Sequence, residues 1–176
     1  MEIGLFYGSS TCYTEMAAEK IAVALSPHRV LLHNIKEVPL AAAERFDVLI
    51  FGISTWDYGE LQEDWASHWP DVERIDLRGR IVALFGLGDQ AGYGDWFLDA
   101  MGMLHELILP KGAQLIGFWP NSPDYNFNAS KALTADGEFF VGLALDEEGQ
   151  YSDSDRRIQQ WAAQLKEELA SLGHQG

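Results

Sequence analysis

The chain has 176 residues, 47% of them hydrophobic and 22% charged, and its formal net charge is −15 at pH 7. Length and composition are typical of one globular domain with its own core, and a single cysteine excludes an internal disulfide. The charge argues against nucleic acid and anionic membranes, which favour clustered Lys and Arg, and it favours partners with basic faces. Acidity that only keeps the protein soluble is the alternative interpretation.

The N-terminal residues 1–4 lack the basic segment of a secretory signal, and no apolar run approaches the length of a membrane span. We therefore expect a cytoplasmic protein without a membrane segment, built as a single domain over residues 1–176. The five histidines are scattered and lack the spacing of metal ligands, so no metal site is expected.

Apolar runs alternate with helix-like stretches, which is the pattern of βαβ units that build a parallel sheet with helices on both faces. A helix from about Thr14 to Pro27 should follow the first strand. Its buried face is predicted to carry Met16, Ala17, Ile21 and Leu25. The first four strands are predicted at residues 3–7, 30–32, 47–53 and 80–85.

The second half is predicted to contain a helix over residues 96–109 and a fifth strand over residues 114–119. Residues 120–138 are polar and lack periodicity, and an apolar run resumes at residues 139–145. We interpret this as one edge strand interrupted by a long loop. A last amphipathic helix is expected over residues 155–172, with Ile158, Trp161, Leu165 and Leu169 buried.

The interrupting loop contains Tyr125 and Phe127 among polar residues. Expected to be exposed, these two aromatic side chains make the loop a candidate docking surface. An ornament of the edge strand without a binding role is the alternative interpretation. Long loops in compact domains are usually functional, which is why the segment is singled out.

In a doubly wound sheet, ligands bind beyond the carboxyl ends of the strands where the strand order reverses. The loop after the first strand contains four Ser and Thr hydroxyls at Ser9, Ser10, Thr11 and Thr14. Hydroxyls and the N–H groups of a helix N-terminus bind a phosphate dianion without Lys or Arg. The Gly-Lys-Ser or Gly-Lys-Thr ending of a triphosphate loop is missing. Simple capping of the helix is the alternative.

The loops after the third and fourth strands each contain a large aromatic residue, Trp56 and Tyr93, where turns prefer small polar residues. Two aromatic rings from neighbouring strand ends can hold a planar heterocycle between them, and each aromatic contact adds roughly 0.5–1.5 kcal/mol beyond burial. Packing onto the edge of the core, as expected for Trp65, Trp69 and Trp96, is the alternative for either ring.

Taken together and in this order, the three loops resemble those of the flavodoxin family, over nearly the whole chain. Ser9, Thr11 and Thr14 match that family's phosphate loop, in which Cys12 replaces a glycine. Thr55-Trp56, the Gly-Asp-Gln-x-Gly-Tyr run at residues 88–93 and the interrupted fifth strand resemble the long-chain branch. Flavodoxins are themselves a known instance of the ligand-binding rule applied above.

The resemblance implies a flavodoxin-like α/β fold: a five-stranded, doubly wound parallel sheet in the order 2-1-3-4-5, with helices on both faces. It also implies non-covalent binding of flavin mononucleotide (FMN), with Trp56 and Tyr93 beside the isoalloxazine and the backbone of residues 87–90 at its pyrimidine edge. The expected cofactor-binding residues are Ser9, Ser10, Thr11, Cys12, Tyr13, Thr14, Ser54, Thr55, Trp56, Asp57, Tyr58, Gly59, Leu87, Gly88, Asp89, Gln90 and Tyr93.

By the same resemblance the protein is a low-potential one-electron carrier that shuttles between semiquinone and hydroquinone and turns over no substrate of its own. The implied partners are an NADPH-dependent flavodoxin reductase and downstream redox enzymes with basic docking faces. The protein itself is expected to be a monomer. The peptide Asp57-Tyr58 would hydrogen-bond the flavin N5–H. Carboxylates beside the loops, each worth up to about 70 mV by Coulomb's law at about 10 Å, lower the potential; they are Asp57, Glu60, Asp89 and Asp95.

Two other classes of protein and one further role stay open at this point. A flavodoxin-like quinone or azo reductase using NAD(P)H needs an open face over the flavin, which Trp56 and Tyr93 would cover. A receiver-like module needs acidic residues where the strands end in Gly8 and Ser54. A reactive Cys12 thiolate at a helix N-terminus is conceivable, although a bound phosphate would disfavour it.

Overall fold

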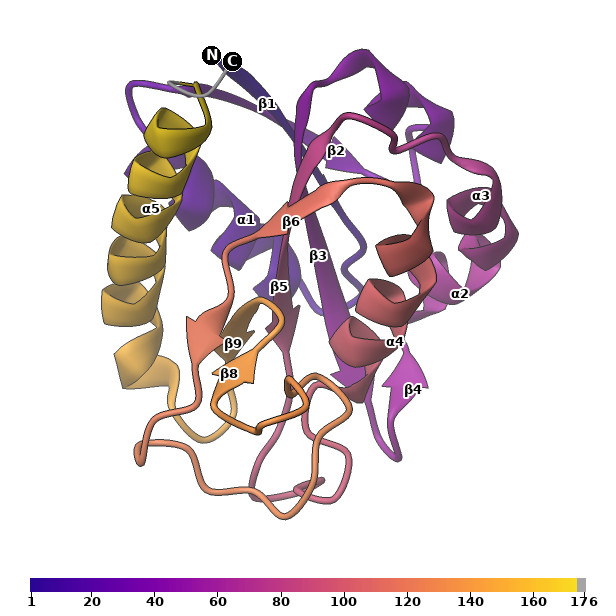
Figure 1. Ribbon diagram of the computed structural model, residues 1–176. Coiled ribbons are helices and arrows are strands. Elements are labelled where there is room, and N and C mark those ends of the chain that lie inside the picture. Colours follow the sequence, from indigo (N-terminus) through magenta and orange to yellow (C-terminus); the bar gives the residue numbers. More distant parts are fainter. Residues whose placement is uncertain (174–176) are drawn as a thin grey trace.

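A parallel sheet forms the centre of the computed structural model, which describes residues 1–173 (Figure 1). Its strands lie in the order β2-β1-β3-β5-β6, with the short β4 (Glu60–Leu61) antiparallel to the end of β3. Setting β4 aside, this is the predicted 2-1-3-4-5 order, so the doubly wound fold is confirmed. The parallel strands are β1 (Glu2–Tyr7), β2 (Arg29–Asn34), β3 (Val48–Trp56), β5 (Ile81–Leu87) and β6 (Gln114–Ile116).

Helices cover both faces of the sheet (Figure 1). On one face α1 and α5 contact each other, and on the other face α2, α3 and α4 lie side by side. No helix within residues 1–173 is long and apolar enough to cross a membrane. The helices are α1 (Tyr13–Ala24), η1 (Leu40–Arg45), α2 (Glu63–Ser67), α3 (Trp69–Arg74), α4 (Asp99–Ile108), η2 (Leu109–Lys111) and α5 (Tyr151–Gly173).

The three central strands β1, β3 and β5 are buried over most of their length, and the last three residues of β3, at the cleft, are partly exposed. Helices on both faces leave no side of these strands in water, so their sequences are continuous apolar runs and not alternating ones. This is why the sequence located them within a few residues. The fully buried side chains of these strands include Ile3, Leu5, Phe6, Leu49, Ile50, Phe51, Val82, Leu84 and Phe85.

The fifth strand is interrupted, as predicted, but over a longer segment. Both β6 and β9 (Leu143–Leu145) pair in parallel with β5. Between them the chain leaves the sheet at Gly117, whose φ of +80° favours glycine, and returns at Gly142, where a Cβ atom would overlap the backbone of Leu84. The interruption, called the insertion below, therefore spans residues 117–142 and not 120–138.

The insertion folds against the rest of the protein. Its β7 (Trp119–Pro120) pairs antiparallel with β8 (Phe139–Phe140), and the rings of Tyr125 and Phe140 pack around Phe97. Tyr125 is only 8% exposed. The expectation that Tyr125 and Phe127 are exposed on a docking loop is wrong. Tyr125 completes an aromatic cluster that belongs to the core, and the partly buried Phe127 packs against Phe97 and Phe140 in the same cluster.

Two expectations about helices also differ from the structure. The helix expected from Trp96 begins at Asp99, because the preceding residue Leu98 has a φ of +60° and breaks the helical path. Met16, expected on the buried face of α1, is 39% exposed. The buried face of α1 consists of Thr14, Ala17, Ala18 and Ile21, which recur every three or four residues. Met16 does not fall in this spacing and lies at the side of that face.

Candidate functional site

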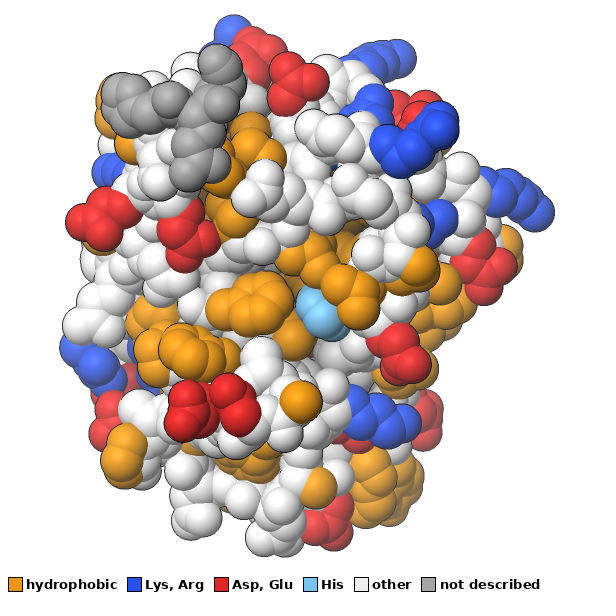
Figure 2. Space-filling model, viewed as in Figure 1, with side chains coloured by type: hydrophobic (Ala, Val, Ile, Leu, Met, Phe, Trp, Pro, Cys, Tyr) orange, Lys and Arg blue, Asp and Glu red, His pale blue; other side chains and the backbone are white. Residues whose placement is uncertain are grey.

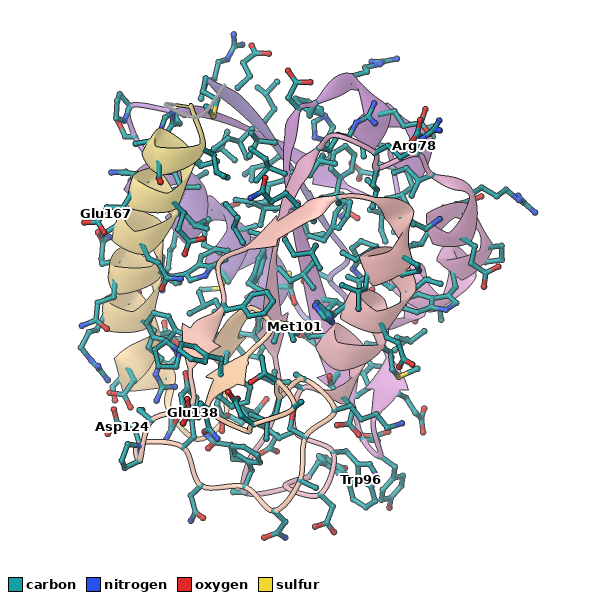
Figure 3. The ribbon with its side chains drawn as sticks, viewed as in Figure 1. Arg78, Trp96, Met101, Asp124, Glu138 and Glu167 are labelled. Carbon is teal, nitrogen blue, oxygen red and sulfur yellow. The ribbon has the colours of Figure 1, made fainter. Side chains whose placement is uncertain are left out.

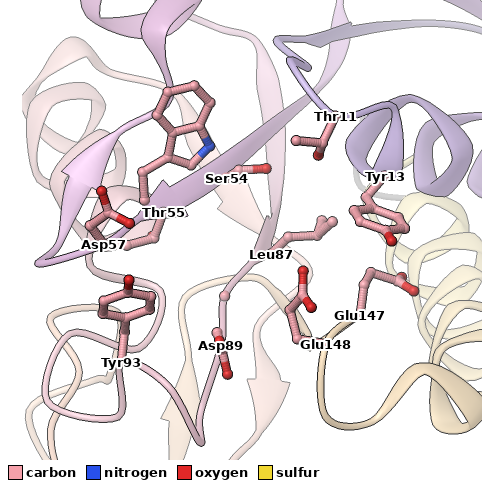
Figure 4. Close-up of a pocket in the computed structure, with 12 residues that line it drawn as sticks. Thr11, Tyr13, Ser54, Thr55, Asp57, Leu87, Asp89, Tyr93, Glu147 and Glu148 are labelled. Atoms are coloured by element: carbon pink, nitrogen blue, oxygen red, sulfur yellow. The ribbon is translucent and has the colours of Figure 1, made fainter.

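A cleft of about 290 Å³ lies at the carboxyl ends of β1, β3, β5 and β9 (Figure 4). The three predicted loops meet there: the hydroxyl loop (residues 9–14), the tryptophan loop (54–59) and the glycine loop (86–93). The carboxyl ends of parallel strands share one edge of the sheet, which brings these distant segments together. The cleft is lined by Thr11, Tyr13, Ser54, Thr55, Trp56, Asp57, Leu87, Gly88, Asp89, Tyr93, Glu147 and Glu148.

In the hydroxyl loop, only part of the predicted set faces the cleft. Thr11 lines it, whereas Ser10 accepts a hydrogen bond from the Gln62 side chain at 2.9 Å. Thr14 is buried, and its Oγ1 lies 2.6 Å from Oγ of Ser54, which ties this loop to the tryptophan loop. The Ser9 hydroxyl is buried and has no hydrogen-bond partner within residues 1–173. Ser9 and Thr11 are therefore the two hydroxyls of this loop that no other side chain engages within residues 1–173.

Cys12 occupies the N-cap position of α1 with a φ of +69°. Its side chain is exposed and makes no capping hydrogen bond. A side chain other than glycine in this left-handed region stores backbone strain of order 1 kcal/mol or more. The next residue, Tyr13, is 40% exposed and lines the cleft. The loop thus keeps the left-handed turn that glycine would make easily, at a cost in strain.

The tryptophan loop is a tight hairpin between β3 and β4. It turns at Asp57 and Gly59, whose φ values are +43° and +86°. The hydroxyl of Thr55 accepts a 2.9 Å hydrogen bond from the Ala100 amide, which joins the loop to the first turn of α4. Tyr58 is 66% exposed. The base of this loop is thus tied to α4, while its tip is open to solvent.

The rings of the tryptophan and glycine loops touch one another. Tyr58 meets Tyr93 edge-on with ring centroids 5.8 Å apart, and it meets Trp96 in the same way at 5.0 Å. Trp96, labelled at the lower right of Figure 3, precedes α4 and is not part of that helix, in which it was expected to lie. Tyr58 and Gly59 do not line the cleft, but the Tyr58 ring contacts Tyr93, which does.

Gln90 turns away from the cleft. Its side chain is buried, donates to Asp146 Oδ2 at 2.9 Å and accepts from the Asn126 amide at 2.6 Å. Its own backbone N–H donates to the same carboxylate oxygen at 3.1 Å. Gly88 and Asp89 line the cleft in its place. Gln90 therefore ties the glycine loop to the insertion and to the end of β9.

Glu147 and Glu148 line the cleft but were not predicted from the sequence. They follow β9, the second half of the interrupted strand, which ends next to β5 at the same edge of the sheet. The rule that ligands bind at the carboxyl ends of strands would have found them, had it been applied to the resumed strand as well as to the first four.

The cleft is strongly acidic, because Asp57, Asp89, Glu147 and Glu148 all line it and none of its lining residues is Lys or Arg. The Asp57 carboxylate raises the pKa of Tyr93 through its charge and a hydrogen bond, and burial raises the pKa of Glu147. Within residues 1–173 no group of three metal-binding side chains is present. Such a cleft disfavours any gain of negative charge by a bound molecule.

Comparison with known proteins decides the family. The family model described as flavodoxin matches residues 5–161. This chain belongs to the flavodoxin family. The sequence is 56% identical to flavodoxin 2 of Salmonella typhi over 97% of this chain and 98% of that protein. It is 44% identical to a flavodoxin of Klebsiella pneumoniae, over 95% of this chain and 94% of that protein.

Among solved structures, this flavodoxin is similar to that of Fusobacterium nucleatum flavodoxin bound to flavin mononucleotide. The two share a TM-score of 0.88 and 30% sequence identity over 95% of this chain and 98% of the other. The resemblance inferred from the three loops is therefore confirmed at the level of both family and fold.

Proposed function

We propose that this flavodoxin binds one FMN non-covalently in the cleft and carries single electrons at low potential, without turning over a substrate of its own. The observation that carries the proposal is the convergence of the hydroxyl, tryptophan and glycine loops on one acidic cleft. FMN supplies reversible one-electron transfer when bound. The residues of this chain hold it, shield it and set its electrostatic surroundings.

The phosphate end of FMN fits the hydroxyl loop. Within the described part of the chain the buried Ser9 hydroxyl has no partner, Thr11 lines the cleft, and α1 begins at Tyr13 with its free N–H groups directed toward the loop. These neutral donors suit a phosphate dianion in a protein that offers no Lys or Arg there. We assign phosphate binding to this loop, which consists of Ser9, Ser10, Thr11, Cys12, Tyr13 and Thr14.

The ring system of FMN fits the other two loops. Trp56 and Tyr93 both line the cleft and provide aromatic faces for a planar ring. Around them, Leu87 and Gly88 offer apolar and backbone surface. We assign binding of the isoalloxazine to these two loops. Gln90, Tyr58 and Gly59 support the loops without lining the cleft. The residues assigned to direct contact with the ring system are Ser54, Thr55, Trp56, Asp57, Leu87, Gly88, Asp89 and Tyr93.

The acidic cleft also indicates the partners. Added electrons raise the negative charge near four carboxylates, so the bound cofactor is a strong reductant. The same carboxylates attract proteins with basic faces. We propose an NADPH-dependent flavodoxin reductase as donor and downstream redox enzymes with basic docking faces as acceptors. We further propose that the chain acts as one cytoplasmic domain and as a monomer.

The test is an anaerobic reductive titration of the FMN-loaded protein, followed by visible absorbance with the potential recorded at each step. We expect two separate one-electron steps, the second at a potential far below that of free flavin. A single two-electron step together with rapid reduction by NADPH alone would identify a reductase instead. A protein that refuses added FMN would contradict both functions.

A matched pair of variants tests the site. Tyr93→Ser should weaken FMN binding about tenfold, since each aromatic contact contributes on the order of 1 kcal/mol and the site also loses apolar surface. Tyr151→Ser serves as the control, because Tyr151 is 53% exposed and lies outside the cleft. Quenching of flavin fluorescence on binding measures both. Equal affinities in the two variants would place the ring elsewhere.

A further inference from the structure

A second cavity of about 290 Å³ lies between α5 and the first part of the insertion. It shares no lining residue with the FMN cleft. Trp119 and Tyr125, each 8% exposed, supply aromatic walls from the insertion. Polar groups come from one side of α5, through Arg156, Arg157 and Gln160. Asp124, at the foot of α5 in Figure 3, stands at its rim.

Arg157 is the unusual group in this cavity. The residue is 1% exposed, and its guanidinium carbon lies 4.2 Å from the centre of the Tyr125 ring, so one face of the guanidinium is covered. Both Nη1 and Nη2 are buried and have no hydrogen-bond partner within residues 1–173. The Asp153 carboxylate forms an ion pair with Nη2 at 4.0 Å, which is beyond hydrogen-bond distance.

A buried guanidinium whose terminal nitrogens donate no hydrogen bond is unfavourable even beside an ion pair, so this side chain favours a ligand that satisfies those donors. The terminal nitrogens of a guanidinium match the two oxygens of a carboxylate or phosphate group. Local charges do not oppose an anion, although the chain as a whole is acidic. Arg156 lies 3.2 Å from Asp153 and 3.9 Å from Asp124, so two arginines and two aspartates balance around the cavity.

We propose that this cavity is a second ligand site, which takes a small organic carboxylate bound by Arg157. The carboxylate receives hydrogen bonds from Nη1 and Nη2, and a flat apolar body lies against Trp119 and Tyr125. The aromatic walls select the organic part, since a compact oxyanion such as inorganic phosphate leaves them without contact. The site is separate from FMN binding and does not depend on it.

Trp119 provides a local reporter for the test. Its Nε1–H donates to the Tyr125 hydroxyl at 2.8 Å, inside the cavity wall. The FMN-loaded protein is titrated with benzoate, and in a second series with inorganic phosphate, at ionic strength held constant with NaCl. The indole signal of Trp119, assigned by its loss in Trp119→Phe, is followed by ¹H–¹⁵N NMR. We expect a saturable shift with benzoate at concentrations at least tenfold below those needed with phosphate.

Variants connect the shift to Arg157. Arg157→Lys keeps the charge but loses the paired donors, so benzoate affinity should fall at least tenfold. Gln160→Phe, at an exposed position on α5, should block the cavity and leave Arg157 in place. Arg78→Gln is the control, because Arg78 is 82% exposed at the opposite end of the molecule (Figure 3). Flavin absorbance confirms that each variant is folded.

Three outcomes would overturn the proposal. The absence of a saturable shift with either probe means that the cavity holds water only. An unchanged benzoate affinity in both Arg157→Lys and Gln160→Phe places the anion elsewhere. Equal affinities for benzoate and phosphate show recognition of an oxyanion without its organic body, which contradicts the assignment to organic carboxylates.

Discussion

The loops of the FMN cleft and the insertion are both polar in sequence, yet the structure holds them differently. In the cleft, Cys12 and Asp57 are exposed in left-handed backbone conformations, and Tyr58 is 66% exposed. In the insertion, Tyr125 and Phe140 are buried in an aromatic cluster. The cleft loops therefore contain strained backbone and exposed side chains, while the insertion contributes buried aromatic side chains to the core.

The difference follows from where the aromatic side chains find partners. Trp56 and Tyr93 line the cleft and keep surface available for a ligand. Phe127 and Phe140 instead pack with Phe97, which precedes α4. Polar composition alone does not separate a ligand-binding loop from a structural one. Figure 2 shows that hydrophobic side chains also gather on the face that includes β6. A pocket near this strand is lined in part by Leu115, Phe118 and Phe139.

The largest expected effect tests whether the insertion is a structural element. Phe140→Ala should lower the free energy of unfolding by about 3–5 kcal/mol, because it leaves a cavity beside Phe97 and Tyr125. Phe139→Ala is the matched control, because the Phe139 side chain, next to Phe140 in the chain, is 39% exposed. Urea unfolding followed by far-UV circular dichroism measures both. A loss in Phe140→Ala no larger than in the control would mean that the insertion is only an ornament.

A smaller effect is expected where the insertion and the cleft meet, at the buried Asp146. Its carboxylate accepts hydrogen bonds from the Gln90 amide and side chain and from the amides of Glu148 and Gly149. Asp146→Asn removes one acceptor oxygen and should cost about 2–3 kcal/mol of unfolding free energy. It should also weaken FMN binding, because the glycine loop loses its tie to β9.

Asp136→Asn is the control for that variant. Asp136 is exposed and accepts from the Glu138 amide at 2.9 Å within a surface turn of the insertion. Its replacement should leave FMN affinity unchanged and stability nearly so. If Asp146→Asn lowers stability but leaves FMN affinity equal to that of the control, the two regions are independent, and the role assigned to Gln90 is wrong.

The charge of the cleft is tested by Asp57→Asn. Asparagine tolerates the left-handed backbone as aspartate does, so the variant removes charge without adding strain. One unit charge about 10 Å from the added electron, at an effective dielectric near 20, is worth about 1.7 kcal/mol, or about 70 mV. The lower of the two midpoint potentials should rise by up to about this amount. Asp76→Asn, far from the cleft, should leave it unchanged, and equal shifts in both variants would exclude a local effect.

The smallest expected effect is on the pH dependence of stability, through His105, which packs against the start of the insertion. His105 on α4 packs edge-on against Phe118 at 5.9 Å, and burial lowers its pKa below the ordinary value of 6.5. The unfolded chain therefore takes up a proton near pH 6.5 that the folded chain refuses until lower pH. Stability falls as pH drops through 6.5 and levels off below the folded pKa. His105→Gln should show a shallower decline between pH 7 and 5 in urea unfolding, and an unchanged slope would contradict this.

The sequence predicted the parts of the fold that depend on local pattern. The central strands are continuous apolar runs, and the loops after them combine hydroxyl and aromatic residues in an unusual way, so both were located correctly. The ends of the insertion were misplaced at residues 120 and 138, where polar composition changes. The true ends are Gly117 and Gly142, which are set by backbone conformation and by contact with Leu84.

Other features depend on contacts between residues far apart in the chain. Gln90 faces inward because it meets Asp146, 56 residues away, and no local pattern reports that partner. The predicted Met16 misses the core because the side of α1 that meets the sheet and α5 carries Thr14, Ala17 and Ile21 instead. Glu147 and Glu148 reach the cleft only because β9 returns to β5 after the insertion.

The division of the fifth strand has a consequence for how chain length varies in this architecture. On β5, Ala83 pairs with Ile116 and Phe85 with Leu143, so only Leu84 separates the two halves of the ladder. A chain that joined β6 to β9 directly would keep the same sheet, the same winding and the same order of strands. The insertion is therefore not needed for the topology of the sheet. In a chain without it, however, Phe97 would lose the aromatic rings that cover it. Shortening such a chain therefore requires repacking one aromatic site, and it requires no change in the path of the sheet.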